Sequence, residues 1–240
     1  MTSSISISSH WLRWIQKSCL LCAHFPRHTS ANVQNLLPLY FSKLCMHCQA
    51  MHNTYRFIDP PFPITLTNIY QNWIIPLQYR DECQAWVHQF KYQANIQMGH
   101  WFIEQMMEQI ITCYAHERFP QALIPIPKHP QRLRELGFHA PLWLAARLGK
   151  LFKIPVLTNV IIKIKPTALQ SDLSAKQRLT NVHKSLLATK PNVLANYTRV
   201  AIIDDVMTTG STLLEAARAL PSHLELDSWC IAWTQLKSSN

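Results

Sequence analysis

Glycine is scarce in this chain: its 240 residues contain only four, at positions 99, 137, 149 and 210. Two common classes of glycine-rich nucleotide-binding motif are absent from the sequence. It contains neither a GxGxxG dinucleotide fingerprint nor a Walker loop ending in GK[ST]. Gly137 and Gly210 fall inside the motifs described below, where we expect a close backbone approach or an unusual φ angle. Internal repeats and low-complexity tracts are also lacking.

Long apolar runs are missing as well. No run approaches the roughly 18 residues that span a bilayer, and the first residues lack the basic start and apolar block of a signal peptide. These absences predict a cytoplasmic protein without a membrane partner. In that compartment the seven cysteines are expected to be thiols or metal ligands rather than disulfides.

Acidic residues are few. The chain has 13 Asp and Glu against 23 Lys and Arg, which gives a net charge of +10 and a pI of about 9.4. Such a balance favours a polyanionic partner, such as pyrophosphate, a nucleotide or nucleic acid. A merely basic surface explains the net charge equally well.

The chain divides by composition into four parts. We predict an N-terminal arm over residues 1–17, a four-cysteine module over 18–55, a proline-containing linker over 56–68 and an α/β domain over 69–240. In the last part strands alternate with helices, which predicts a parallel sheet with helices on both faces. The expected helices are 81–92, 96–114, 132–148, 173–182 and 211–220, and the expected strands are 121–126, 160–164, 199–204 and 226–234.

The most informative stretch covers residues 200–213. An apolar run ends in Asp204 and Asp205, and a turn rich in hydroxyl groups then leads into a helix. Free N–H groups and the helix dipole favour a phosphate at such a helix start, and two carboxylates can accept hydrogen bonds from ribose hydroxyls. We therefore predict a ribose 5-phosphate site; in the alternative, Asp205 and the hydroxyls only cap a helix. The turn contains Thr208, Thr209, Gly210, Ser211 and Thr212.

A second informative stretch covers residues 123–139. A short apolar strand runs into a proline-bounded loop that carries Lys128 and His129, and Arg132 and Arg134 stand where the next helix begins. Cations at the carboxyl end of a strand suit a pyrophosphate group. A solvated basic helix start is the alternative.

Four cysteines form two CxxC pairs, separated by 22 residues. Each pair can turn both sulfurs toward one ion, so that the two pairs complete the tetrahedral thiolate site of structural zinc. Buried free thiols or redox pairs are the alternatives, and His24 and His47 are interpreted as surface residues. The predicted zinc ligands are Cys19, Cys22, Cys45 and Cys48, and the predicted core thiols are Cys83, Cys113 and Cys230.

The stretch over residues 200–213 resembles the phosphoribosyl-pyrophosphate (PRPP) loop of type I phosphoribosyltransferases. Together with residues 123–139 and the cysteine module, it resembles more narrowly the ComF family, also called the GntX family. Phe90-Lys91-Tyr92 matches the family's F-K-Y element, and residues 167–181 match its T-x-x-Q and R-x-x-N elements. The resemblance covers nearly the whole chain from about residue 18.

The resemblance implies a type I phosphoribosyltransferase-like domain preceded by a zinc ribbon. Asp204 and Asp205 would hold the ribose hydroxyls and serve as the catalytic acids, the 208–212 loop would hold the 5-phosphate, and Mg²⁺ would bind with PRPP. The reaction implied is displacement of pyrophosphate from C1, with Lys128, Arg132 and Arg134 stabilising the departing charge. The acceptor is not identified. Thr167, Gln170 and Arg178 would lie on a mobile loop that closes over the site.

The sequence departs from the family pattern at two places. Residues 136–140 read Leu-Gly-Phe-His-Ala where the family favours Arg-Gly-Phe-Asn-Gln, which puts a pyrophosphate or acceptor contact in doubt. Lys163 and Lys165 stand where arginine is common, so that charge is kept and bidentate geometry is lost.

The family is linked to natural competence, to imported single-stranded DNA and to recombination or replication-restart proteins. The second hypothesis is therefore a non-enzymatic accessory protein that binds a nucleotide or DNA through this fold and its zinc ribbon. Aromatic rings could stack on bases, although core or interface packing is the simpler interpretation. The rings considered are those of Trp11, Trp14, Trp73 and Trp101.

Overall fold

The computed structural model describes residues 64–164 and 185–234, which belong to the second of two compact units, Met1–Tyr55 and Arg56–Asn240. The predicted arm, the four-cysteine module with its zinc ligands and the predicted helix 173–182 lie outside the described residues. These predictions, and the domain boundaries, therefore stay predictions. Within the described residues, no helix is both long enough and apolar enough to cross a membrane.

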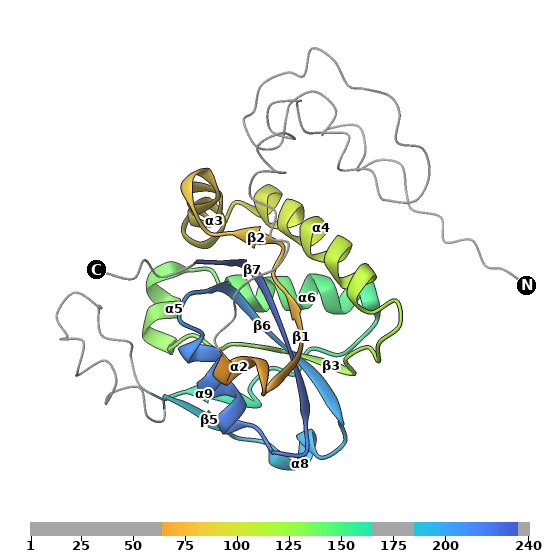
Figure 1. Cartoon of the computed structure of the whole chain (residues 1–240). Helices are drawn as coiled ribbons and strands as arrows, with labels where there is room; N and C mark the ends of the chain where they lie inside the picture. Colours follow the sequence, from red (N-terminus) through yellow and green to blue (C-terminus); the bar gives the residue numbers. More distant parts are fainter. Residues whose placement is uncertain (1–63, 165–184, 235–240) are drawn as a thin grey trace, which may run out of the picture. The chain divides into compact units, whose positions relative to one another are not determined.

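The centre of the described unit is a parallel sheet (Figure 1). Its strands are ordered β1-β7-β6-β3, and each pairs with its neighbour in parallel, as the sequence predicts. A further short strand, β2, pairs with the end of β7 beyond β1. The bounds are β1 Tyr70–Ile74, β2 Leu77–Gln78, β3 Ala122–Pro125, β6 Arg199–Met207 and β7 Glu225–Trp233.

Helices cover both faces of this sheet. On one face α6 contacts β3 and β6, and α4 contacts β1, β7 and α6. Strand side chains alternate between the faces, and Val200 and Ile202 share a buried cluster with Leu213 and Ala216 of α9 on the other face. The bounds are α3 Asp81–Gln93, α4 Ile96–Cys113, α6 Ala140–Phe152 and α9 Ser211–Ala219.

Helix α4 shows why these segments are helical. Its buried residues recur every three or four positions, as on one face of a helix. Asn95 caps its start, because the side-chain oxygen accepts a hydrogen bond of 3.2 Å from the backbone N–H of Met98. The buried face includes Met98, Trp101, Phe102, Met106 and Ile110.

The predicted helix 132–148 is wrong as a single element. The chain forms α5 (Pro130–Leu136) and α6, and Gly137 lies between them with a φ of +64°. A residue in this left-handed conformation ends a helix, and glycine adopts it without steric cost. Helix α6 then begins as a separate helix, with Pro141 in its first turn. Backbone N–H groups in the first turn have no partner within the helix, so proline loses no hydrogen bond there.

The predicted strand 160–164 exists, but it is not part of the parallel sheet. Strand β4 (Ile161–Lys163) pairs antiparallel with β5 (Leu186–Ala188) in a separate two-stranded sheet. Strands β1 and β2 were not predicted, nor were two short helices: α8 (Pro191–Leu194), and α2 (Ile64–Thr67), which lies within the predicted linker. Of the predicted core thiols, Cys83 and Cys230 are buried, and Cys113 is partly exposed.

Candidate functional site

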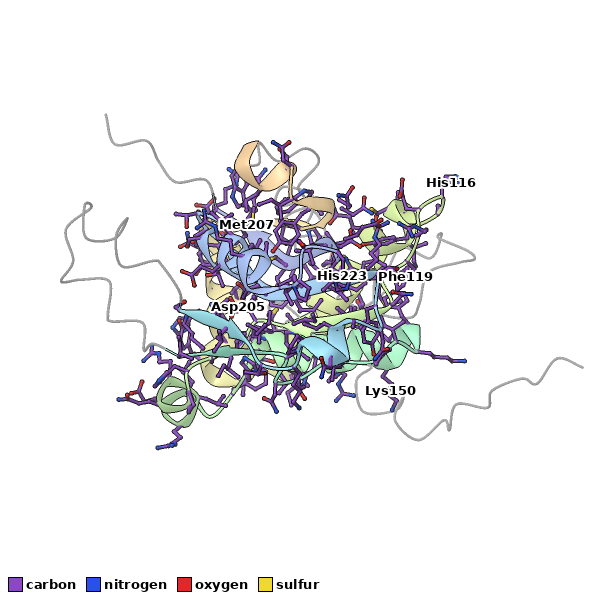
Figure 2. All side chains as sticks on the ribbon, turned by 90° about the horizontal axis from the view of Figure 1, so that it is seen from below. His116, Phe119, Lys150, Asp205, Met207 and His223 are labelled. Atoms are coloured by element: carbon purple, nitrogen blue, oxygen red, sulfur yellow. The ribbon has the colours of Figure 1, made fainter. Side chains whose placement is uncertain are left out.

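The two informative stretches of the sequence meet at one edge of the sheet. Strands β3 and β6 are parallel neighbours, with Pro125 opposite Ile203, and the N–H of Ile126 donates to the carbonyl of Ile203 at 2.8 Å. The loops that follow the two strands therefore both open at the carboxyl edge, where ligands of parallel sheets bind. Asp205 and Met207 lie toward the carboxyl end of β6, whereas His116, Phe119 and His223 precede β3 or β7 and so lie toward the opposite edge of the sheet; Figure 2 labels all five side chains.

Asp204 and Asp205 are successive residues near the end of β6, so their side chains leave opposite faces of the sheet. The Asp205 side chain is buried, and its Oδ1 accepts hydrogen bonds from Nζ of Lys91 at 2.9 Å and from the N–H of Val206 at 2.7 Å. Asp204 as a residue is partly exposed, but its carboxyl group is enclosed by protein, and its Oδ1 accepts from the N–H of Asp205 at 2.8 Å. One acid is thus already paired, and the other has an oxygen left for a ligand.

Burial and neighbouring charges set the protonation of Asp204 and of Lys91. Burial raises the pKa of the Asp204 carboxyl to about 7, and the negative charge of Asp205 adds to the shift, against the opposing charges of Lys91 and Lys163. Burial alone would lower the pKa of Lys91, but the charge and hydrogen bond of Asp205 outweigh burial and raise it. Lys91 is therefore an ammonium ion at neutral pH, while Asp204 carries a proton part of the time.

Lys128 follows β3 in the proline-bounded loop. Its Nζ is buried and has no hydrogen-bond partner among the residues that the structure describes. Burial lowers the pKa of Lys128, the positive charge of Lys91 lowers it further, and Asp205 and Asp204 oppose these effects. A buried ammonium without a partner is costly. An anion that reached Nζ would remove this cost.

The other three predicted pyrophosphate residues lie around helix α5. His129 caps the helix, because its Nδ1 accepts from the N–H of Gln131 at 3.3 Å. Arg132 is exposed and forms an ion pair with Glu135 at 2.8 Å, and Arg134 is exposed as well. This is the arrangement that a solvated basic helix start would give, so a pyrophosphate role for these residues stays a prediction.

His139 belongs to the site, although the sequence marked it only as a departure from the family pattern. Its Nε2 lies 3.1 Å from the carbonyl oxygen of Ile126, in the loop that carries Lys128. Burial lowers the pKa of His139, and the charge of Lys128 lowers it further. The neutral ring therefore donates Nε2–H to the carbonyl, which leaves Nδ1 as an acceptor.

The hydroxyl loop lies between β6 and α9. Thr208 and Thr209 are exposed, and Gly210 is buried with a φ of +74°. Oγ1 of Thr209 accepts from the N–H of Ser211 at 3.3 Å and lies 3.0 Å from Oγ of Ser211, as a capping hydroxyl would. Oγ of Ser211 and the N–H of Thr212 stand beside this turn, at the positive end of α9. The local geometry suits an anion.

Mg²⁺ is usually held by one or two carboxylates together with waters and the phosphates of its ligand. No group of three or more His, Cys, Asp or Glu side chains gathers in residues 64–164 and 185–234, so at the proposed site the protein ligands would be the carboxylates of Asp204 and Asp205. Lys91 occupies one oxygen of Asp205. Phosphate oxygens of the bound ligand would complete the coordination. The predicted mobile-loop residues Thr167, Gln170 and Arg178 lie outside the described residues.

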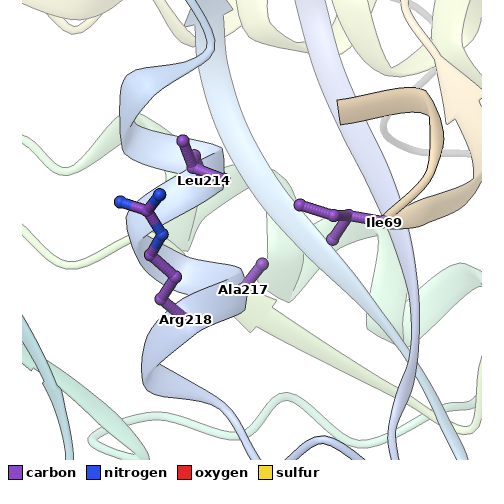
Figure 3. A pocket seen from close by; sticks show the side chains of 4 residues that line it. All are labelled: Ile69, Leu214, Ala217 and Arg218. Atoms are coloured by element: carbon purple, nitrogen blue, oxygen red, sulfur yellow. The ribbon is translucent and has the colours of Figure 1, made fainter. Parts of the chain in front are cut away.

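A separate pocket lies between α9 and Ile69, which connects α2 to β1 (Figure 3). Its volume is about 410 Å³, and it is open to solvent and mostly apolar. None of its lining residues was predicted as a site residue, and the acid pair does not line it. The lining residues are Ile69, Leu214, Ala217 and Arg218.

Fold and site together define an α/β protein with a parallel sheet, whose carboxyl edge carries an acid pair, two lysines and a hydroxyl loop at a helix start. No family model matches the chain. The chain is 38% identical over 104 residues to competence protein F of Haemophilus influenzae, a match that spans 43% of this chain and less than half, 45%, of that protein. It is 22% identical over 169 residues to DNA utilization protein YhgH of Salmonella typhimurium and of Escherichia coli strain K12, over 69% of this chain and 73% of each relative. These matches confirm the resemblance to the ComF family.

Proposed function

We propose that this chain binds PRPP at the carboxyl edge of its parallel sheet. The observation that carries the proposal is the pairing of β3 with β6, which brings the Lys128 loop and the hydroxyl loop to one edge. The 5-phosphate would lie on the 208–212 loop, the ribose hydroxyls on Asp204 and Asp205, and the diphosphate toward Lys128. The buried, unpartnered ammonium of Lys128 supports the last of these contacts.

The reaction proposed for this site is pentosyl transfer. The bond between C1 and the diphosphate oxygen breaks, the electron pair leaves with pyrophosphate, and a nucleophile that the sequence does not identify bonds to C1. Positive charge develops on the sugar ring, and the acid pair would stabilise it. Contacts to the distant 5-phosphate would hold C1 in place. Any Mg²⁺ would accompany the diphosphate, and Thr167, Gln170 and Arg178 would close over the ligand.

Isothermal titration of the full chain with PRPP tests this proposal. Ser211→Asp places a carboxylate at the start of α9, where it favours the helix but repels a phosphate. We expect wild type to bind PRPP and Ser211→Asp to bind at least about tenfold more weakly, as a lost charge-assisted contact would produce.

The matched control for this titration is Arg218→Gln, which removes an exposed charge from the far end of the same helix. It should bind PRPP like wild type. The proposal fails if wild type shows no binding of PRPP, with or without Mg²⁺.

The names of the relatives favour a role in natural competence, because one is a competence protein and another a DNA utilization protein. We propose that this chain takes part in the uptake or processing of single-stranded DNA, alongside competence, recombination or replication-restart proteins. PRPP-dependent chemistry on a component of imported DNA would unite the two proposals. A screen of nucleobases and nucleotides for pyrophosphate release would identify the acceptor.

The second candidate is a non-enzymatic accessory protein that binds DNA through its fold and its zinc ribbon. The net charge of +10 and the relatives' names favour it. Trp101 offers no ring to a base, because it is 1% exposed, and Trp73 is partly buried and packs against Tyr70. Stacking would therefore have to use other rings, among which Trp11 and Trp14 lie outside the described residues.

Binding of single-stranded DNA at several salt concentrations tests this candidate, because phosphate contacts make affinity fall steeply with salt. Loss of binding in a Cys45→Ser, Cys48→Ser variant, together with loss of one zinc ion per chain, would support a zinc-ribbon DNA interface. Salt-independent binding, or binding that survives loss of zinc, would contradict it.

A further inference from the structure

The carboxyl edge of the sheet carries more positive than negative charge. Two ammonium groups, Lys91 and Lys128, act on the same carboxylate of Asp205, and each also responds electrostatically to Asp204. Within residues 64–164 and 185–234, Asp205 is the member of the acid pair that an ion pair holds, at 2.9 Å from Lys91. Because Asp204 binds a proton near neutral pH, the negative charge of the pair falls short of two. The excess positive charge selects an anion.

The two lysines reach this place from different elements. Lys91 belongs to α3, and Lys128 follows β3. Their mutual repulsion contributes to the lowered pKa of Lys128, so the two ammonium groups lie within electrostatic range of each other. An ammonium group has three N–H donors. On Lys91, one of them bonds to Asp205. On Lys128, none bonds to any of the described residues. Several donors are therefore free for oxygen ligands.

A diphosphate group normally brings a divalent cation with it, because the metal neutralises crowded phosphate oxygens. The described residues hold no group of three or more metal-ligating side chains, but they do supply two ammonium groups. We propose that Lys91 and Lys128 together bind the diphosphate directly, so that inorganic pyrophosphate binds to this chain without Mg²⁺. This inference rests on the proposed function, and it adds Lys91 to the ligand-binding residues.

Pyrophosphate binding would also account for the position of Lys91. Without a ligand, the ammonium of Lys91, whose side chain is 20% exposed, forms an ion pair with Asp205. The ammonium of Lys128 then has no hydrogen-bond partner within the described residues. With a diphosphate present, Lys91 would bridge Asp205 and a phosphate oxygen, and Lys128 would gain its first partner. Charge-assisted hydrogen bonds to phosphate are the strong ones in proteins.

The test is isothermal titration of inorganic pyrophosphate into the full chain, in metal-free buffer and in buffer with Mg²⁺ at the same ionic strength. We expect pyrophosphate to bind in the metal-free buffer, where the two ammonium groups are the cations that neutralise it. Lys128→Gln should weaken binding about tenfold or more in both buffers, as loss of a charge-assisted hydrogen bond does.

Lys91 needs a second variant, because Lys91→Gln alone leaves the buried Asp205 without its partner and can unfold the protein. The double variant Lys91→Gln, Asp205→Asn replaces the ion pair by a neutral pair of similar shape. It should fold and bind pyrophosphate about tenfold or more weakly. Lys150→Gln removes an exposed lysine of α6 (Figure 2) and serves as the control for net charge.

Two results would overturn the inference: binding of pyrophosphate only in the presence of Mg²⁺, or wild-type affinity in Lys128→Gln. If PRPP with Mg²⁺ binds while pyrophosphate alone does not, the inference fails and the proposed function stands. If neither PRPP nor pyrophosphate binds in either buffer, the proposed function fails with it.

Discussion

Leu66 and Gly210 fit against each other so closely that a Cβ atom at position 210 would lie 2.2 Å from Cδ1 of Leu66. Leu66 belongs to α2, at the start of the described residues, and Gly210 ends the hydroxyl loop. Gly210 also has a φ of +74°, which side chains disfavour. A helix that supplies no ligand therefore shapes the proposed phosphate loop from outside.

Gly210→Ala should lower the free energy of unfolding by about 2–5 kcal/mol, the sum of left-handed backbone strain and overpacking against Leu66. Urea unfolding measures this change. Leu66→Ala in the same chain should recover part of the loss, because the two positions are in contact and their effects are coupled.

Gly137→Ala is the matched control, because Gly137 has a φ of +64° and a Cβ added there would have no atom within 4 Å. It carries the backbone strain without the clash, so the loss should be only about 1–2 kcal/mol. Equal losses at the two glycines would show that the contact with Leu66 is unimportant.

At the opposite end of the sheet, Arg199 and Asp227 form a buried bidentate ion pair with two contacts of 2.9 Å. Asp227→Asn should lower the free energy of unfolding by about 3–5 kcal/mol, because the guanidinium of Arg199 loses its buried bidentate partner and keeps only the more distant carboxylates of Glu117 and Glu225, at 3.9 Å. The comparison is Arg118→Gln, which breaks an exposed ion pair with Glu225 and should cost less than about 1 kcal/mol. Similar losses in urea unfolding would contradict this ranking.

The elements that the sequence predicts well are those with a strong local pattern. Continuous apolar runs identify β6 and β7 as buried parallel strands, and apolar residues at helical spacing identify α4. Strands β1 and β2 were missed, because Pro76 separates them and β1 mixes polar with apolar residues. The antiparallel partner of β4 was missed as well, because three-residue β5 lies beyond a long connection and gives no periodic signal.

Some features of the candidate site can also be predicted from the sequence, whereas others depend on the tertiary structure. The acid pair and the hydroxyl loop are adjacent in sequence, so their pattern can be read directly. The ion pair between Lys91 and Asp205 joins residues 114 positions apart, and only the packing of α3 beside the sheet reveals it. The sequence identifies Lys128 as a cation, but the burial of its Nζ without a partner is a property of the tertiary structure.

Asp204 should make stability depend on pH. Its carboxyl has a pKa of about 7 in the folded chain, against an ordinary value of 3.8. Between these values the folded state binds more protons than the unfolded state, so the free energy of unfolding contributed by Asp204 falls as the pH rises. Below this window the contribution is constant, and above about pH 7 the loss is complete.

The Asp204→Asn variant cannot ionise at this position. Relative to wild type it should therefore gain stability as the pH rises from about 5 to about 7, and the difference should level off above that. Urea unfolding of both proteins at several pH values measures the difference, and titrating groups far from Asp204 contribute equally to both curves. A difference that does not change with pH would show that Asp204 ionises normally.

His139 reports on the charge beside it. Burial and the ammonium of Lys128 lower the pKa of His139 below its ordinary value of 6.5, so removing or neutralising that ammonium should raise the pKa. We expect a raised pKa of His139 in Lys128→Gln, and also in wild type with pyrophosphate bound, measured by NMR titration of the imidazole nitrogens. The resonances of His223, which precedes the amino end of β7, should respond to neither change. If His139 has the same pKa in Lys128→Gln as in wild type, the two side chains are not electrostatically coupled. A change in the pKa of His139 on binding pyrophosphate would then have to come from direct contact with the anion.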